Sequence, residues 1–169
     1  MITESDVFTC LGLFLQDILP AGVDVVQGQD NRVPAPAAPD YVVMWSSSRA
    51  RLSTNHVVYD RDAETKTSTA PTKVTMQVDV HGPKCADNTQ IFTTLFRDSY
   101  AADFFRNLGK GVAPLSCDDG QQLPFLNGQK QFENRWTLYA QFQINPDVST
   151  NQTFADSITP QLIEADAEG

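Results

Sequence analysis

The segment VTMQVDVHGP, residues 74–83, carries the clearest β-strand pattern in the chain. Three valines and a methionine alternate with four polar residues, and Gly82 and Pro83 close the segment. Because successive side chains of a strand point to opposite faces, this pattern predicts a strand with one buried face. Residues 136–145 show the same alternation up to Asn145 and Pro146, which predicts a second long amphipathic strand.

Helical patterns flank these strands. Residues 4–19 place apolar side chains at helical spacing after the capping-box pair Thr3 and Asp6, and Pro20 follows. Asp87 is expected to cap a second helix, which carries Ile91, Phe92, Leu95 and Phe96 on one face. It either continues or kinks into SYAADFFRNLG, residues 99–109, where Ser99 repeats the capping-box spacing and the final glycine gives a stop signal.

The other segments predict shorter elements. We expect strands at 23–26, at 41–45, from about 50 to 60 and near Val112, an exposed connection at 60–72, and a tight turn at Asn127 and Gly128. This order predicts an α+β fold, with a largely antiparallel (mixed) β-sheet flanked on one face by two main α-helices. We expect a single domain over residues 1–158 and an acidic, flexible tail over 159–169.

The charge of the chain limits its partners. With 169 residues, a net charge of −9 and a pI near 4.5, it is a poor candidate for binding a phosphate backbone, which requires Lys and Arg. Its three cysteines are far apart and predict reduced thiols in a cytosol-like compartment. The apolar N-terminal segment resembles neither a signal peptide nor a membrane span.

Catalytic and metal-binding patterns are weak. His56 and His81 lie at outward strand positions without ligand spacing, which favours ordinary surface histidines. Asp118 and Asp119 precede a glycine but lack the spacing of a calcium loop, which favours a solvated turn. The sequence gives no separation for a carboxylate pair of Asp79 and Glu133. We therefore expect no catalytic residue, no metal site and no cofactor.

The segment VVQGQDNRVPAPAAPDYVVM, residues 25–44, sets polar residues and prolines between two apolar runs. Gly28 is its only glycine and prolines follow it, whereas a phosphate-binding loop needs several glycines and a following helix. Pro34 and Pro36 stiffen the segment and remove amide donors. The segment can pack over its own sheet or project to a neighbour, and both possibilities stay open.

The run ILPAGVDVVQGQDNRVPAP, residues 18–36, together with YVVM at 41–44 and RLSTN at 51–55, resembles the tailed-bacteriophage neck or tail terminator family. The motif that carries this resemblance consists of Val26, Gly28, Gln29, Asn31, Arg32 and Pro34. The later segments LFRDSYAADFF, 95–105, and RWTLYAQFQINP, 135–146, fit the same family.

This resemblance implies a structural protein of the virion, located at the neck, that assembles in the host cytoplasm. Such proteins form a ring, usually hexameric, at the head-proximal end of the tail. The ring ends polymerisation of the tail tube, and of the sheath in contractile phages, and joins the tail to the head-tail connector protein. DNA would pass through the lumen without specific binding, and the acidic charge suits that passage. The family fold is also α+β.

On this interpretation, a loop is expected to lie at an inter-subunit or tail contact. Its residues are Gln29, Asn31, Arg32, Val33, Pro34 and Pro36. The Arg32 guanidinium could form a bidentate pair with an acidic partner, or an ion pair within its own domain. Two alternatives stay open, a head-completion or connector protein of the same neck and an acidic phage-encoded hydrolase. The hydrolase would need a cleft that holds a carboxylate or histidine with a shifted pKa.

Overall fold

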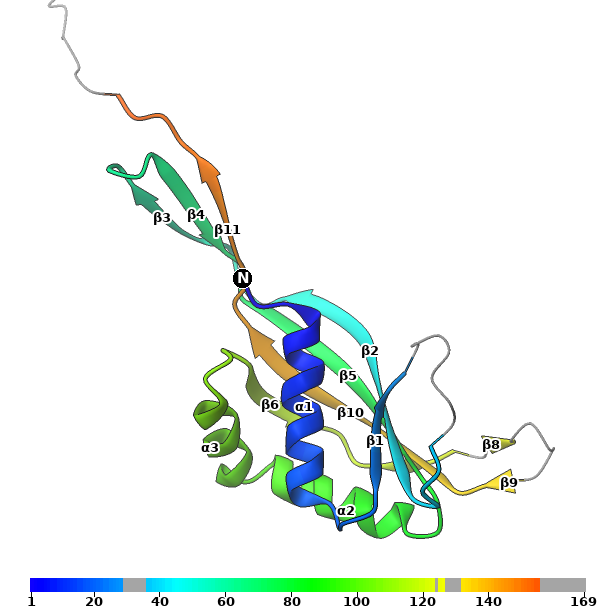
Figure 1. Ribbon diagram of the computed structural model, residues 1–169. Helices are drawn as coiled ribbons and strands as arrows, with labels where there is room; N and C mark the ends of the chain where they lie inside the picture. The colour runs from blue at the N-terminus through cyan, green and yellow to red at the C-terminus, as the bar shows by residue number, and fades with distance from the viewer. Residues whose placement is uncertain (29–35, 124, 127–131, 156–169) are drawn as a thin grey trace, which may run out of the picture.

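A six-stranded mixed β-sheet forms the centre of the protein, as the computed structural model shows (Figure 1). The structure describes residues 1–28, 36–123, 125–126 and 132–155. The strand order is β1-β2-β5-β10-β6, and β7 also pairs with β10. Among the described strand pairs of this sheet, only β1–β2 is parallel. The strands are β1 (Asp24–Gln27), β2 (Tyr41–Arg51), β5 (Thr72–His81), β6 (Ala113–Cys117), β7 (Gln121–Gln122) and β10 (Arg135–Ile144).

The two predicted amphipathic strands are β5 and β10, and they are neighbours across the middle of the sheet. Their apolar residues share one face, as the alternation predicts, and are almost completely buried. They are Val74, Met76, Val78 and Val80 in β5 and Leu138, Ala140, Phe142 and Ile144 in β10. The predicted α+β class with a largely antiparallel sheet is confirmed.

Three helices cover this apolar face: α1 (Glu4–Ile18), α2 (Cys85–Phe96) and α3 (Ser99–Leu108) (Figure 1). The predicted capping box of α1 is present, with Thr3 and Asp6 bonded to each other's backbone N–H groups. The second helical pattern is interrupted, because Arg97 ends α2 and the Asp98 side chain caps α3 by accepting from the Tyr100 N–H. The predicted starts were therefore wrong, since α2 begins at Cys85 and α3 is capped one residue before Ser99.

Phe14 of α1 joins the three helices at the centre of the core. Its ring centroid lies 6.0 Å from that of Phe92 and 5.9 Å from that of Phe96, both in α2. The rings of Phe104 and Phe105 in α3 each lie 5.3 Å away. Edge-to-face and tilted contacts at these distances add to the stabilisation from burial alone. This aromatic cluster fixes the helices to one another and to the sheet.

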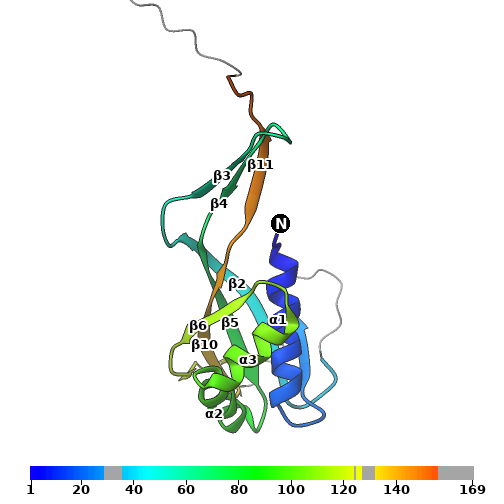
Figure 2. The same cartoon turned by 90° about the vertical axis from the view of Figure 1, so that its left-hand side faces the viewer.

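A second sheet, of strand order β11-β4-β3, projects from the body as an arm (Figures 1 and 2). It consists of β3 (His56–Asp60), β4 (Thr65–Thr69) and β11 (Asp147–Asn151). The predicted strand at 50–60 is thus divided between β2 and β3, and the predicted exposed connection at 60–72 contains β4. Its Ser/Thr composition suggested a loop, but threonine is β-branched and fits a strand that pairs on both sides.

A short hairpin of β8 (Phe125–Leu126) and β9 (Phe132–Glu133) extends from the other end of the sheet (Figure 1). The predicted turn at Asn127 and Gly128 lies outside the described residues. The predicted tail, 159–169, also lies outside them.

Candidate assembly surfaces

The predicted contact loop connects the parallel neighbours β1 and β2, so strands of one sheet flank it as expected. Five of its six predicted residues, Gln29, Asn31, Arg32, Val33 and Pro34, lie outside the described residues, and Pro36 alone is described. Both ends of the segment are held by hydrogen bonds. The Gly28 N–H donates to the Met44 carbonyl (2.7 Å), and the Ala38 N–H donates to the Asp24 carboxylate (3.3 Å). The loop therefore begins and ends at the β1 edge of the sheet.

Gly28 lies directly against the indole ring of Trp45. A Cβ atom at this position would lie 2.5 Å from two ring atoms, which no ordinary side chain can accept. The single glycine of the segment is therefore required for the close approach of backbone to indole. This contact lies at the entrance to the predicted loop.

The second face of the main sheet is not covered by any described helix. The strand register aligns its side chains in rows across β2, β5 and β10. These rows are Tyr41–His81–Arg135, Val43–Asp79–Thr137 and Trp45–Gln77–Tyr139. We call this surface the open face. It combines aromatic rings with hydrogen-bonding groups, a composition that suits protein contact surfaces.

The open face contains two buried polar residues. His81 is 5% exposed and stacks on Tyr41, with ring centroids 4.5 Å apart. The prediction of an ordinary surface histidine was correct for His56 and wrong for His81, because the His81 imidazole is buried against the Tyr41 ring of β2. Asp79 is 4% exposed and accepts hydrogen bonds from the Thr137 hydroxyl (2.7 Å) and the Gln77 amide (3.0 Å).

Asp79 and Glu133 do not act as a pair in this structure. Glu133 accepts a 3.5 Å hydrogen bond from the Tyr41 hydroxyl, while Asp79 is bonded to Thr137 and Gln77. Each carboxylate thus has its own partners. The geometry supplies a structural role for both groups.

We expect the free energy of unfolding to fall as the pH is lowered from about 7 to 5, partly because of His81. Burial has the largest effect on His81 and lowers its pKa. The negative charges of Asp79 and Glu133 oppose this effect and raise the pKa. The unfolded chain therefore binds a proton near its ordinary pKa of about 6.5, before the folded chain does. The stabilisation is complete above that pKa and is lost as the pH falls toward the folded value. Urea unfolding at several pH values measures this slope. His81→Gln should flatten it, and the exposed control His56→Gln should leave it unchanged.

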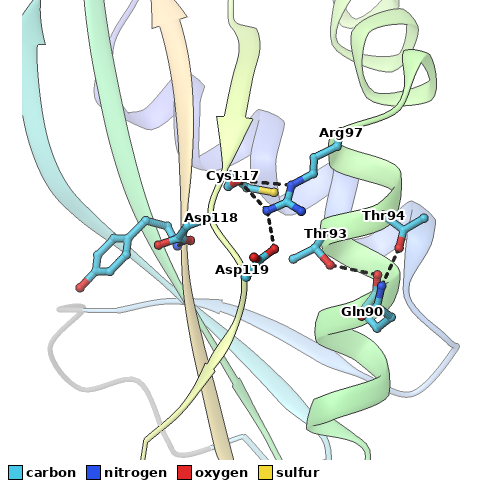
Figure 3. Close-up of polar contacts among 8 residues, drawn as sticks. Gln90, Thr93, Thr94, Arg97, Cys117, Asp118 and Asp119 are labelled. Atoms are coloured by element: carbon cyan, nitrogen blue, oxygen red, sulfur yellow. Dashed lines mark hydrogen bonds and ion pairs between the residues drawn. The ribbon is translucent and has the colours of Figure 1, made fainter.

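Asp118 and Asp119 have structural partners, so the predicted solvated turn is only partly correct (Figure 3). The Asp118 carboxylate accepts the Tyr139 N–H at 2.5 Å. Arg97, at the end of α2, donates to the Asp119 carboxylate (2.7 Å) and twice to the Cys117 carbonyl (2.9 and 3.3 Å). The guanidinium therefore ties α2 to the end of β6.

We expect Arg97→Ala to lower the free energy of unfolding by about 1 to 2 kcal/mol, because it removes both bonds to the carbonyl of Cys117. Asp119→Asn should cost less than about 0.5 kcal/mol, since Asp119 is 89% exposed and solvent screens its ion pair. Urea unfolding of both variants separates the two contributions. Equal losses would show that the ion pair, and not the carbonyl contact, stabilises this junction.

The arm has two chemically different faces. Register places Val57, Tyr59 and Val148 on one face, which we call the apolar arm face. Lys66, Ser68 and Thr150 of the neighbouring strands lie on this face with them. The opposite face has Val58 among Thr, Ser and acidic side chains. No residue of the three strands is buried, and a small sheet without a covered apolar face is marginally stable. The arm was not predicted from the sequence, although the alternating threonines at 65, 67 and 69 were a signal of it.

An apolar groove of about 420 Å³ lies between α3 and β6. Phe105 and Val112 form its base, and Ala102 and Pro114 line its sides. Arg106 is the one charged residue among its lining side chains. Nothing in the sequence pattern singled out this groove, because its lining comes from a helix and a strand that only the fold brings together.

Among the described residues, no group of three His, Cys, Asp or Glu side chains could hold a metal ion. The three cysteines are buried and unpaired. Burial is the main cause that raises the pKa of each thiol, which disfavours the reactive thiolate. In the described part of the chain, no helix is long and apolar enough to cross a membrane.

The fold is similar to that of an assembly protein of known structure. One matching chain is described as "Cryo-EM Structure of an Extracellular Contractile Injection System, PVC sheath/tube terminator in extended state", with a TM-score of 0.52 and 10% sequence identity. The match covers 99% of this chain and 65% of the other, so the protein spans about two thirds of its length. At this identity the similarity establishes the fold.

The family follows from the sequence. The profile of the family described as "Phage neck terminator protein" matches residues 5–166, nearly the whole chain. The protein belongs to this family, and it is therefore a bacteriophage structural protein of the tail-terminator type. Comparison with curated proteins gives no significant match. The resemblance carried by residues 18–36 is confirmed.

Proposed function

We propose that this protein forms a hexameric ring at the head-proximal end of the phage tail. The ring ends polymerisation of the tail tube and any sheath, and it joins the tail to the head connector. It acts by assembly, without a chemical step or a cofactor. The observation that carries this proposal is the family match over residues 5–166.

The surfaces of the protein support an assembly role. The apolar arm face exposes Tyr59 and Val148, and the open face exposes Tyr139. A ring built from different patches on the two sides of each subunit uses heterologous contacts that close by rotation. The protein of similar fold is described as a sheath/tube terminator, which supports a position at the end of a tube or sheath.

The net charge is consistent with a DNA channel. Six copies would place about six times the charge of −9 around the lumen, and this repels the phosphate backbone. DNA would then pass through without specific binding. We propose the virion neck as the location of the ring, after assembly in the host cytoplasm.

We also propose that the loop containing Arg32 lies at a subunit or tail contact. Its two ends are fixed to the sheet at Gly28 and Ala38, which limits where it can reach. Arg32→Glu is expected to keep the thermal stability of the isolated protein but to prevent its incorporation into particles. If instead the thermal stability falls, Arg32 forms an ion pair within its own domain.

Electron microscopy of particles assembled without this protein tests the proposed function. We expect overlong tails and heads that lack tails. Tails of normal length that are properly joined to heads would contradict termination. Tails of normal length that remain detached would favour the alternative role of a head-completion or connector protein.

A further inference from the structure

We propose that the apolar arm face of one copy docks in the α3–β6 groove of a second copy of this chain. This inference rests on the proposed ring and identifies the surfaces that would form its repeated contact. The partner is a second copy because one chain carries both halves of the contact, an apolar projection and an apolar groove, at two separate places.

The arm supplies the projection. Tyr59 and Val148 are each 58% exposed on the apolar arm face. Within the arm, Lys66 lies over the Tyr59 ring (5.9 Å to its centroid), and Phe154 meets the same ring edge-on (6.2 Å). These contacts hold the tyrosine in place but leave most of it in water. An aromatic side chain fixed in this way loses little entropy when it binds, as is typical of interface hot spots.

The groove supplies a matching recess. Phe105 and Val112 are its buried lining residues, and Gly109 and Gly111 line one end. Both glycines have positive φ, 63° and 71°, so the turn that shapes this end depends on them. A volume of about 420 Å³ is sufficient for an aromatic side chain with its aliphatic neighbours.

The charges of the two surfaces are complementary. The arm, residues 56–69 and 147–151, contains four acidic residues against Arg61 and Lys66, so its net charge is −2. Residues 99–114, which form α3 and the rim of the groove, contain one acidic residue, Asp103, against Arg106 and Lys110, so their net charge is +1. This segment is basic in a chain of net charge −9. Opposite charges favour this docking over contacts between two acidic surfaces.

The contact has to form between copies. In both views the arm leads away from the body, with its tip far from α3 (Figures 1 and 2). An arm that cannot reach its own groove can still reach that of a neighbour. Because the two patches differ, each copy donates one arm and accepts another, and the contact can be repeated around a ring.

Sedimentation velocity of the full chain at increasing protein concentration tests the contact. We expect self-association, weakened at least about tenfold by Val148→Lys, which places a charge on the apolar arm face. Val58→Lys is the matched control, since Val58 is similarly exposed (51%) on the opposite face of the arm.

In the groove, Ala102→Gln should block docking, whereas Asn107→Gln, also exposed on α3, should not. Thermal unfolding shows whether each variant is folded. If Val148→Lys does not fold, Ala102→Gln alone tests the contact.

A mixture of variants tests the head-to-tail arrangement. Val148→Lys retains an intact groove, and Ala102→Gln retains an intact arm. An equal mixture is therefore expected to form dimers and nothing larger, while each variant alone stays monomeric. A wild-type chain that remains monomeric up to millimolar concentration overturns the proposal, as does equal weakening by the two lysine variants or by the two glutamine variants.

The same variants separate this inference from the proposed function. Phage particles that carry either variant should show the overlong tails expected when the protein is missing. Tails of normal length in these particles, together with overlong tails when the protein is absent, would overturn the arm–groove contact and leave termination intact. Normal tails in the variant particles and in particles without the protein would contradict termination itself. The sedimentation results would then be the only test of the arm–groove contact.

Discussion

Phe14→Ala is expected to lower the free energy of unfolding by about 3 to 5 kcal/mol, the range for truncating a buried phenylalanine. Phe14 is completely buried, and its ring contacts aromatic rings of α2 and α3. Truncation would remove the ring that joins the three helices and leave a cavity that the rigid sheet cannot fill. The loss is a large part of the stability of a typical domain. Urea unfolding followed by circular dichroism gives its size.

Leu13→Ala is the matched control for this prediction. Leu13 precedes Phe14 on the same helix but is 43% exposed, and alanine preserves helix propensity. We expect a loss below about 1 kcal/mol. If the two variants lose similar stability, the aromatic cluster is not the centre of the core.

Gly82→Ala is expected to lower the free energy of unfolding by about 3 kcal/mol, from backbone strain and steric overlap together. Gly82 has φ of +106°, and an added Cβ would overlap the Pro39 carbonyl oxygen and lie 2.6 Å from an Asp40 carboxylate oxygen. The same Asp40 oxygen accepts the Lys84 N–H (2.8 Å) just before α2. The added methyl group would therefore disturb both the strand exit and the start of this helix.

Gly22→Ala separates strain from overlap. Gly22 also has a positive φ, +94°, but nothing lies within 4 Å of its added Cβ. We expect its loss to be about 1 kcal/mol, from backbone strain alone. Thermal and urea unfolding of both variants measure the difference. Equal losses would show that the close approach of residues 39 and 40 to Gly82 contributes nothing.

The strands β5 and β10 and the helix α1 could be predicted because their side chains obey strict local periods. Alternation in 74–81 and helical spacing in 4–19 reflect burial of one face, and local sequence records that burial directly. The break between α2 and α3 could not be placed in the same way, because the polar side chains near Asp98 allow several helix starts. In the structure, Asp98 sets the start of α3, because its side chain accepts a hydrogen bond from the Tyr100 N–H.

The candidate surfaces were predicted less completely. The contact loop could be proposed from its prolines and its family motif, but the groove joins Phe105 to Pro114 across two elements. A local period in the sequence does not reveal that residues of two different elements line one groove. β4 was interpreted as a loop because its threonines are polar, and only pairing with β3 and β11 shows it to be a strand.

The α+β class, the two long amphipathic strands and the family could all be predicted from the sequence, because each depends on local periodicity or on a contiguous motif. Three features became visible in the folded protein alone: the burial of His81 and Asp79, the uncovered apolar arm face, and the groove between α3 and β6. These features depend on contacts between residues distant in the chain. The free energy of such contacts is set by how the elements pack, and not by the residues of any one element.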